Sequence, residues 1–252
     1  MSILRRLGNK KKLAKKIQAY FPKHKIYIEP FFGAGGMFFN KPKAQYNIVN
    51  DLDSDVFNLF QVVMNQKEEL EKAFYMMPIH SDLLEYWKTN QETDPIKKAL
   101  RFLFLSNFTY LGKGDTLRNG TENPKNILYK NIDNTSDCLE NVQFFNKDFK
   151  QFLKLLREKN AKDSFIYCDP PYLSTANNYL DGFTQQDSLD LFDTLEQTKC
   201  KWAMSEFDHP FILQQAKQRG LNIIEIGERQ SLKNRRTEIL VTNYSNAQQS
   251  LF

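Results

Sequence analysis

Short apolar segments alternate with helical patterns along most of the chain, and this alternation constrains the fold more than any other feature. Clusters of β-branched and aromatic residues predict strands at residues 25–30, 46–51, 141–149, 165–171 and 201–207. Apolar residues at helical spacing predict helices at residues 10–21, 53–74, 94–107, 149–158, 189–197 and 210–220. Strands that alternate with helices indicate an α/β fold with a mostly parallel sheet.

Two regions depart from this alternation. Residues 221–228 and 237–244 are predicted to form a final antiparallel pair of strands. Between about residues 107 and 141, many glycine, asparagine and threonine residues indicate loops or hairpins. We therefore expect a Rossmann-like core domain built from residues 1–54 and 145–252, with an inserted helical and loop subdomain at residues 55–144.

The distribution of charge points toward a polyanionic partner. The net charge is +5, and the first 28 residues contain nine lysines or arginines and no acid. A second basic group near the C-terminus consists of Arg229, Lys233, Arg235 and Arg236. Such clusters suit nucleic acid, whose phosphates supply most of the sequence-independent affinity, although a merely solvated face gives the same pattern.

The sequence carries no sign of a secreted, membrane or metal-binding protein. No apolar run approaches the length of a membrane span, and residues 1–6 lack the apolar core of a signal peptide. Three cysteines lie far apart and three histidines show no metal-ligand spacing, so neither a disulfide framework nor a metal site is expected. A cytoplasmic protein without a bound metal fits these observations.

A glycine-rich turn follows the first predicted strand. Gly33, Gly35 and Gly36 allow the backbone to approach a ligand without Cβ clashes, and Asp51 follows 18 residues after Gly33. This is close to the spacing at which an acid meets ribose hydroxyls in nucleoside-binding α/β folds. Phe38 stands where a dinucleotide fingerprint needs its third glycine. A pyrophosphate cofactor is therefore disfavoured, and a nucleoside with a short tail, such as S-adenosylmethionine, fits better.

A second strand runs directly into two prolines. Asp169-Pro170-Pro171-Tyr172 follows the apolar run at residues 165–168. Successive prolines remove two backbone donors and fix φ, so neither a strand nor a helix continues through them. The exit from the strand is rigid, with Asp169 and Tyr172 held beside it. Taken alone, the same residues are compatible with an ordinary strand-end turn.

In their order along the chain, these motifs resemble the DNA adenine-N6 methyltransferases of the Dam type, the D12 class or α group. The matching stretches are Gly8-Asn9-Lys10, Glu29–Phe39, Asn50-Asp51, Asn146–Phe149, Phe165–Tyr172, Gly182–Thr184, Arg229 with Ser231, and Thr237–Tyr244. The resemblance runs almost from end to end. It implies methyl transfer from S-adenosylmethionine to the exocyclic amino group of adenine in double-stranded DNA.

The resemblance also implies which residues contact the cofactor. They are Arg6, Lys10, Phe32, Gly33, Gly35, Asp51, Asp148, Phe149 and Asp169. Asp51 would bind the ribose, the residues of the glycine turn the methionine end, and Asp148 with Phe149 the adenine. Arg6 departs from the family pattern, which usually has an aromatic residue there; either Arg6 stacks in its place or that contact is lost.

The chemistry explains why this reaction needs Asp-Pro-Pro-Tyr. The lone pair of an adenine amino group is delocalised into the ring, which makes the nitrogen a poor nucleophile. The Asp169 carboxylate and the Pro170 carbonyl can both accept hydrogen bonds from it and localise the lone pair, and Pro171 helps to fix these acceptors in advance. Tyr172 would stack on the target base, which must be flipped out of the duplex.

The resemblance places target recognition in the inserted subdomain. Lys113, Arg118 and Asn119 lie there among glycines, and arginine and asparagine are well suited to bidentate base reading, although a solvated loop arginine is an equal reading of Arg118. The basic group at residues 229–236 would contact phosphates. Residues Gln248–Phe252 resemble the short peptide that docks on the sliding clamp of bacterial replication, although a tail folded on its own core explains them as well.

Two alternatives to adenine methylation remain open from the sequence. The same chemistry serves other acceptors, namely cytosine N4, an adenine in RNA or a glutamine amide in a protein. A DNA-binding protein of this fold without turnover is the second alternative. The intact Asp169–Tyr172 stretch disfavours it, because a protein that only binds DNA has no need of the two acceptors.

Overall fold

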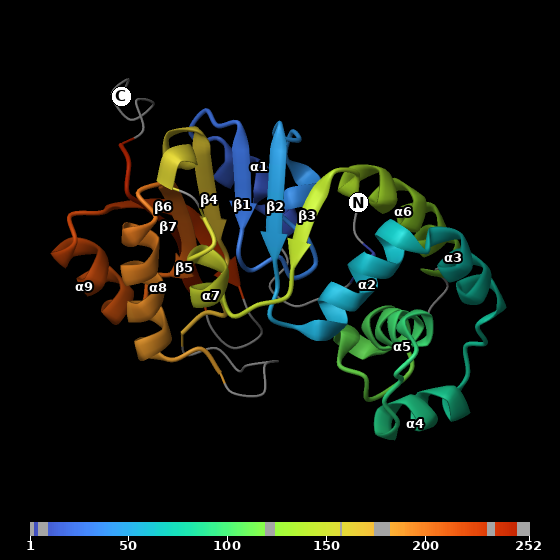
Figure 1. Cartoon of the computed structure of the whole chain (residues 1–252). Coiled ribbons are helices and arrows are strands. Elements are labelled where there is room, and N and C mark those ends of the chain that lie inside the picture. The colour runs from blue at the N-terminus through green and yellow to red at the C-terminus, as the bar shows by residue number, and fades with distance from the viewer. Residues whose placement is uncertain are drawn as a thin grey trace. The chain divides into compact units, whose positions relative to one another are not determined.

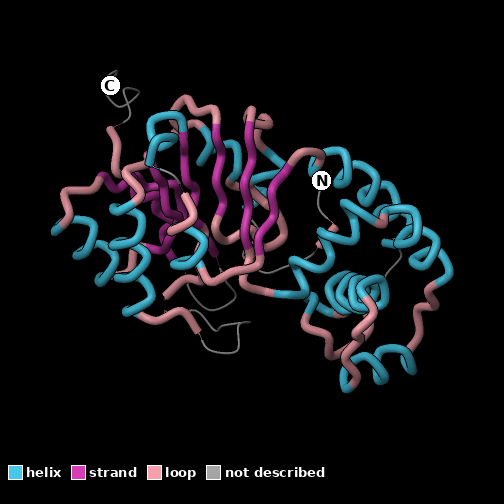
Figure 2. Tube along the Cα trace, in the orientation of Figure 1, coloured by secondary structure: helices cyan, strands magenta, loops and turns pink. Residues whose placement is uncertain are grey.

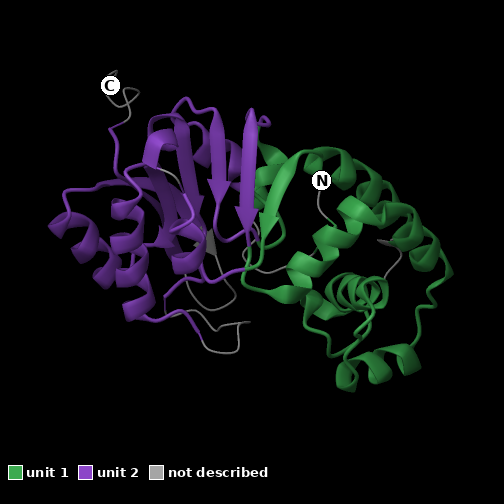
Figure 3. Cartoon of the chain, in the orientation of Figure 1, with its two compact units in different colours: residues 1–12, 33–41, 51–146 green, residues 13–32, 42–50, 147–252 purple. Residues whose placement is uncertain are grey.

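The computed structural model describes residues 3–4, 10–118, 124–156, 158–173, 182–230 and 235–245, without the side chains of residues 124, 229, 230 and 235. The chain forms two compact units (Figure 3). The helical unit consists of residues 1–12, 33–41 and 51–146, and the sheet unit of residues 13–32, 42–50 and 147–252.

A seven-stranded sheet with the order β3-β2-β1-β4-β5-β7-β6 organises the fold (Figure 1). The strands are β1 (Ile26–Glu29), β2 (Tyr46–Asn50), β3 (Val142–Phe145), β4 (Ser164–Cys168), β5 (Lys201–Phe207), β6 (Asn222–Gln230) and β7 (Arg235–Thr242). β1 pairs in parallel with β2 and β4, and β4 pairs in parallel with β5. β7 runs antiparallel to both β5 and β6. The predicted Rossmann-like α/β fold with an antiparallel C-terminal pair is confirmed.

Helices cover both faces of the sheet within the sheet unit. α1 (Ala14–Gln18) lies on one face, and α7 (Phe149–Leu153), α8 (Gln185–Gln197) and α9 (Pro210–Gln218) lie on the other (Figure 1). After α1, the Phe21 ring lies 4.6 Å from that of Phe165 and 5.4 Å from that of Tyr167. On α8, the Phe192 ring lies 6.2 Å from that of Trp202 on β5. Side chains alternate along a strand, so β4 is buried from both sides, as its uninterrupted apolar sequence requires.

The other unit is mainly helical (Figure 2). Its helices are α2 (Ser54–Asn65), α3 (Lys67–Met76), α4 (Ser81–Thr89), α5 (Pro95–Phe108) and α6 (Pro124–Leu139). The starts of α2 and α5 follow local capping rules. Asp53 accepts the N–H groups of Asp55 and Val56, and Asp94 accepts that of Lys97. The rings of Phe104 and Phe108 stack at 5.7 Å in the core of this unit.

The structure corrects the expectation for residues 124–139. This stretch, expected to contain loops or hairpins, forms the 16-residue helix α6. Leu128, Ile132 and Leu139 recur at helical spacing and are buried where α6 packs on α2 and α3. The asparagine-rich composition between these positions concealed the apolar stripe. Pro124 begins the helix, where a missing N–H costs nothing.

Two smaller differences concern the same unit. The single helix expected at residues 53–74 is divided into α2 and α3 at Gln66, whose φ of −141° and ψ of 40° are not helical. α4 lies in a stretch for which no element was predicted. Short 3₁₀ segments occur at Lys10–Lys12, Phe38–Asn40, Tyr110–Gly112 and Glu158–Asp163.

Within the described parts of the chain, no helix combines the length and the apolar character needed to cross a membrane.

Candidate functional site

The strand order creates a topological switch between β1 and β4. From this point the sheet continues through β2 on one side and through β5 on the other. In open α/β sheets, ligands bind outside the carboxyl ends of the strands at such a switch. Pro30 directly follows β1 and Asp169 directly follows β4, so the chain leaves both central strands beside this point.

Asn50, the last residue of β2, holds two of the segments that leave the sheet. Its side-chain N–H groups donate to the carbonyl of Pro30 at 3.0 Å and to that of Lys147 at 2.9 Å. Its Oδ1 accepts the N–H of Lys147 at 3.0 Å, and its backbone carbonyl accepts the N–H of Phe32 at 2.9 Å. Only 1% of the Asn50 surface is exposed. These buried bonds fix the start of the glycine-rich segment and the start of the segment after β3 at one edge.

The glycine turn, residues 33–37, is held by Asp51 within the helical unit. The Asp51 carboxylate accepts the N–H of Gly33 at 2.6 Å and that of Asp53 at 2.9 Å. Gly33 and Gly35 have φ of +54° and +66°, which favour glycine. Among the described residues, only chain neighbours come within 4 Å of the place where a Cβ on Gly33 would stand. The turn therefore leaves space beside its backbone for a ligand.

Three phenylalanine rings gather where segments leave the sheet, and we call them the phenylalanine cluster. The ring of Phe31 lies 5.5 Å from that of Phe149 and 6.1 Å from that of Phe183, and the last two are also 6.1 Å apart. Phe149 begins α7, and the side chain of Asp148 caps this helix by accepting the N–H of Lys150 at 2.9 Å. Aromatic faces of this kind can pack against a flat purine ring.

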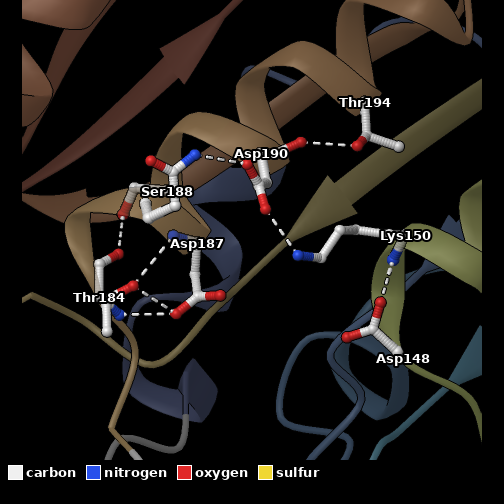
Figure 4. Close-up of polar contacts among 8 residues, drawn as sticks. Asp148, Lys150, Thr184, Asp187, Ser188, Asp190 and Thr194 are labelled. Carbon is white, nitrogen blue, oxygen red and sulfur yellow. Dashed lines mark hydrogen bonds and ion pairs between the residues drawn. The ribbon is translucent and has the colours of Figure 1, made fainter.

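Polar contacts fix the helix starts that carry two of these rings (Figure 4). Lys150 on α7 donates to Asp190 on α8 at 2.6 Å, which lowers the pKa of the Asp190 carboxyl and raises that of the Lys150 ammonium. Before α8, the Oγ1 of Thr184 accepts the N–H of Asp187 at 3.1 Å, and the Asp187 carboxylate accepts the N–H of Thr184 at 2.9 Å. This capping box sets the entry of the chain into α8.

The double-proline exit, residues 169–173, begins where β4 ends at Cys168. The Asp169 side chain is half-buried, and Pro170 is buried. Burial raises the pKa values of Tyr167 and Cys168 well above their ordinary range, and the negative charge of Asp169 contributes to both shifts. The Asp169 carboxylate therefore stands beside a buried phenol and a buried thiol that both stay neutral.

Tyr172 is enclosed on its hydroxyl side and on one ring face. Its hydroxyl donates to the carboxylate of Glu238 on β7 at 2.5 Å, and its ring meets that of Phe207 edge to face with centroids 4.8 Å apart. Exposure is 7% for Tyr172 and 0% for Glu238. Burial raises the pKa of Tyr172 well above its ordinary value, and the charges of Asp169 and Glu238 add to this. The phenol is therefore neutral and acts as the donor.

Leu173 is held through its backbone. Its N–H donates to Glu206 on β5 at 2.8 Å, and the other oxygen of Glu206 accepts the N–H of Phe207 at 2.6 Å. Arg236 donates to the Leu173 carbonyl at 3.5 Å, and its guanidinium lies 5.5 Å from the Phe207 ring centroid. Desolvation raises the pKa of Glu206 to about 8, against the two N–H bonds that lower it; Asp169 and Glu238 contribute to the rise.

A compact hairpin follows α5 in the helical unit. Thr109 pairs antiparallel with Leu117, and the Oγ1 of Thr109 accepts the N–H of Gly114 at 2.8 Å. Lys113 and Arg118 are exposed on this hairpin. The loop character expected for this part of residues 107–141 is thus present, and the contact of both basic residues with DNA stays a prediction.

The predicted site residues fall in both units. Lys10, Gly33, Gly35, Asp51, Lys113 and Arg118 belong to the helical unit. Phe32, Asp148, Phe149, Asp169, Pro170, Pro171, Tyr172 and Arg236 belong to the sheet unit. Arg6, Asn119, Lys233 and Gln248–Phe252 lie outside the described residues, as do the side chains of Arg229 and Arg235. Lys10 is 3% exposed, which is unusual for a lysine, and its contact with the cofactor stays a prediction.

Sequence reasoning gave no role to Glu206, Phe207 or Glu238. Glu238 belongs to a stretch that resembled the family, but its bond with Tyr172 joins residues 66 positions apart, and the Glu206 bond with Leu173 joins residues 33 apart. Asn50 and Phe31 were likewise quoted only as parts of motifs. A glutamate beside the apolar residues of a predicted strand, as in both β5 and β7, is the signal that was available in the sequence.

The described residues contain no cluster of histidine, cysteine and acidic side chains that could hold a metal ion. Cys138, Cys168 and Cys200 are free thiols. Burial raises the pKa of Cys200, and the SH group of Cys200 donates weakly to the Thr198 carbonyl.

Comparison with known proteins gives a consistent assignment. The sequence profile of the D12 class N6 adenine-specific DNA methyltransferases matches residues 7–240. A protein named DNA adenine methylase from Salmonella typhi is 28% identical over 203 residues, which cover 75% of this chain and 71% of that protein. The type II methyltransferase M1.LlaDCHI from Lactococcus lactis subsp. cremoris is 27% identical over 278 residues, 95% of this chain and 94% of that protein.

Solved structures resemble the chain only distantly. An rRNA methyltransferase from Streptomyces viridochromogenes aligns with a TM-score of 0.40 and 10% identity, over 91% of this chain and 82% of that protein.

The match of the family profile spans far more than half of the residues. The chain belongs to the D12 class N6 adenine-specific DNA methyltransferases.

Proposed function

We propose that the protein transfers a methyl group from S-adenosylmethionine to the N6 amino group of an adenine flipped out of double-stranded DNA, in the cytoplasm. The membership of the family supports the adenine-specific DNA methylation. The cofactor, the flipping of the base and the roles of individual residues are inferred from the geometry of the strand ends.

One observation carries the proposal. Asp169-Pro170-Pro171 leaves the carboxyl end of β4, beside the topological switch of the sheet, at a strand end buried on both faces. A half-buried carboxylate and a proline carbonyl at this place provide two neighbouring hydrogen-bond acceptors just beyond the end of the strand.

The residues fit S-adenosylmethionine. The open space beside Gly33 admits a ligand against the turn, and the turn is held by the Asp51 carboxylate, a group with about four acceptor positions that suits ribose hydroxyls. The phenylalanine cluster offers apolar faces for the adenine. When bound, S-adenosylmethionine supplies an activated methyl group on a sulfonium centre.

In the proposed mechanism the protein binds and orients rather than forming a covalent intermediate. Asp169 and the Pro170 carbonyl accept the two amino hydrogens of the adenine, which localises the nitrogen lone pair. Because φ is fixed in both prolines, little reorganisation accompanies the reaction. The Tyr172 ring stacks on the flipped base, a contact worth about 1–3 kcal/mol on other aromatic platforms. Asp169 is also the acceptor placed to draw off the proton that the methylated nitrogen must lose.

The basic side chains complete the proposal. Lys113 and Arg118 lie exposed on the hairpin that follows α5 and contact the DNA, with Asn119 beside them in sequence. Arg229, Lys233, Arg235 and Arg236 contact phosphates. Gln248–Phe252 remains a candidate peptide for a sliding clamp. Loss of clamp capture on removal of these five residues would support that contact, and no capture by the intact chain would dismiss it.

Methyl transfer from labelled S-adenosylmethionine, followed by nucleoside analysis, tests the function. N6-methyl-2′-deoxyadenosine from the DNA is expected. Label in N4-methylcytosine, in RNA or in protein would replace the substrate by one of the alternatives, and no transfer to any acceptor would favour a DNA-binding protein without turnover. Asp169→Ala should abolish transfer with the thermal unfolding transition unchanged, and near-normal turnover would refute the role of Asp169.

A further inference from the structure

Side chains from β5 and β7 enclose the two residues that follow the double proline. Glu206 and Phe207 end β5, and Glu238 lies opposite Phe207 in the antiparallel ladder with β7. They contact Tyr172 and Leu173, which directly follow the proposed acceptors at Asp169 and Pro170. The contacts all lie within the sheet unit.

The two glutamates act on opposite faces of the sheet. Glu206 and Phe207 are neighbours in one strand, so their side chains point to opposite faces. Phe207 and Glu238 are register partners and share the face on which the Tyr172 ring packs. Glu206 reaches the N–H of Leu173 from the other face. The chain after Pro171 is thus held by contacts on both faces of the sheet as it passes the end of β5.

The two glutamates that hold this segment are costly to bury. Glu206 is 1% exposed and Glu238 is fully buried. A buried carboxylate loses its hydration, and an apolar residue of similar volume usually serves stability at least as well. What the carboxylates add is direction, because each accepts a hydrogen bond that only one position of the Tyr172 hydroxyl and of the Leu173 peptide satisfies.

The neighbouring strand is shaped around Glu238. The ladder between β6 and β7 shifts register between Glu225 and Gly227, and Gly227 is the partner of Glu238. Gly227 has φ of +143°, which L side chains rarely adopt. Bulges of this kind occur beside active sites, where they redirect a side chain.

On the assumption that the proposed function is correct, we infer that Glu238 and Glu206 are positioning residues for methyl transfer. Glu238 sets the orientation of the Tyr172 ring through its hydroxyl. Glu206 fixes the orientation of the peptide group that carries the Leu173 N–H. Through the stiff proline pair, it also fixes the position of the Asp169 and Pro170 acceptors. Arg236, bonded to the Leu173 carbonyl, holds the same residue from its other backbone group.

The test is a double-mutant cycle measured by single-turnover methyl transfer to duplex DNA. Glu238→Gln keeps the shape of the side chain but replaces a charged acceptor by a weaker neutral one, and Tyr172→Phe removes the donor while keeping the ring. Each variant should transfer methyl on the order of 10 to 100 times more slowly, because small misplacements of reacting groups have effects of this size. The double variant should be no slower than the slower single variant, because both act through one hydrogen bond.

Glu206→Gln provides the second arm. Its single amide oxygen can accept only one of the two N–H groups that Glu206 holds. Its rate should fall by a similar factor, and this loss should add to that of Tyr172→Phe, because Glu206 acts through the Leu173 peptide and not through the hydroxyl. Glu225→Gln, an exposed glutamate on β6 opposite Ile239, is the matched control and should transfer methyl at the wild-type rate.

Two further measurements separate positioning from folding. The DNA dissociation constant and the thermal midpoint of Glu238→Gln should stay within about twofold and a few degrees of the wild type, while the transfer rate falls. The ¹³Cζ resonance of Tyr172 in tyrosine-labelled protein, assigned with Tyr172→Phe, should move in Glu238→Gln and stay in Glu225→Gln. This readout does not depend on any activity.

The outcomes distinguish this inference from the proposed function. A wild-type protein that methylates no DNA refutes the proposed function, and with it the positioning role, even if the tyrosine resonance moves. A wild-type protein that methylates adenine while Glu238→Gln keeps the full rate refutes the positioning role alone. Losses of Glu238→Gln and Tyr172→Phe that multiply in the double variant would do the same.

Discussion

The glycine turn and the double-proline exit are both held in a fixed shape after a strand, but by opposite means. Both follow a central parallel strand, and both are fixed by carboxylates that accept hydrogen bonds from the chain. The glycine turn gains its shape from positive φ angles and one nearby acid, Asp51, and leaves space beside Gly33. The double-proline exit gains its shape from fixed φ angles and from two acids on other strands, and it is packed against Phe207.

The shape of the glycine turn suits the binding of a ligand, whereas that of the double-proline exit suits the positioning of side chains. A turn that must receive a cofactor keeps its backbone accessible, so small residues and a single acceptor suffice. An exit that must hold two acceptors and a ring for a second substrate needs each group fixed from outside. The glycine turn should therefore respond to mutation mainly through cofactor affinity, and the double-proline exit mainly through the rate of the chemical step.

The largest effect is expected when Asp51 of the glycine turn is changed. Asp51→Asn leaves one acceptor oxygen for the N–H groups of Gly33 and Asp53, so one of them faces an amide donor. We expect a loss of about 1–3 kcal/mol in the free energy of unfolding. S-adenosylmethionine affinity, measured by calorimetry, should fall by more than tenfold, because the ribose acceptor is also weakened.

Asp53→Asn is the matched control for that change. Asp53 caps α2 by accepting the N–H of Asp55 at 2.9 Å, and asparagine is an equally good cap. The control should bind S-adenosylmethionine as the wild type does. Equal losses in both variants would mean that Asp51 supports only the helix start and would remove the distinction between the two regions.

The next effect concerns stability and not cofactor binding: it is a pH dependence, and it belongs to the double-proline exit. Burial raises the pKa of Glu206 to about 8, whereas an unfolded glutamate titrates near its ordinary value of about 4.3. Between these values the unfolded state releases a proton that the folded state keeps. Glu206 therefore makes the protein progressively less stable as pH rises from about 4.3 to 8, by at most about 1.4 kcal/mol per pH unit, and its contribution levels off above pH 8.

Urea unfolding at a series of pH values measures this contribution. In Glu206→Gln that part of the slope should be absent, since glutamine carries no titrating proton. An unchanged slope would show that Glu206 ionises normally despite its burial, and would remove the pH dependence from the double-proline exit.

How much of these two regions is predictable follows from the sequence distance of their contacts. Gly33, Gly35 and Asp51 form a local pattern whose strand context can be read directly, and the structure joins Gly33 to Asp51 by a hydrogen bond. Asp169 to Tyr172 were singled out in the sequence for the same reason. The partners of Tyr172 and Leu173 lie on strands that are remote in sequence, and only the order β4-β5-β7 brings them to the exit.

The fold shows the same limit. The parallel strands and the antiparallel pair were predictable because their β-branched and aromatic residues cluster in short segments bounded by turn residues. α6 was missed because its buried positions, Leu128, Ile132 and Leu139, are separated by asparagine, aspartate and lysine, and because composition was weighed above spacing. Spacing was the better guide, since packing of one apolar stripe outweighs intrinsic propensity.

Gly33→Ala should have a smaller effect on stability and tests whether the space beside the turn is used. Alanine at φ of +54° is strained by about 1–2 kcal/mol, but it meets no described atom beyond its chain neighbours. The thermal midpoint should therefore fall only modestly. If a cofactor occupies this space, S-adenosylmethionine affinity should fall by a much larger factor than the stability loss explains. Unchanged affinity would place the cofactor elsewhere.

Asp190→Asn should have the smallest effect, and it tests whether burial makes the other carboxylates matter. Asp190 also accepts a short hydrogen bond, from Lys150 at 2.6 Å, but the Asp190 and Lys150 side chains remain 28% and 39% exposed. This bond lowers the pKa of Asp190, so its contribution to stability is present above the ordinary carboxyl pKa and is lost as pH falls through the lowered value. Solvent and salt screen exposed pairs, so the urea midpoint at neutral pH should scarcely change, and the transfer rate should stay at the wild-type level. If Asp190→Asn slowed methyl transfer as much as Glu238→Gln, any short hydrogen bond to a carboxylate near the strand ends would have the same effect on the rate. The contrast between the glycine turn and the double-proline exit would then lose its physical basis.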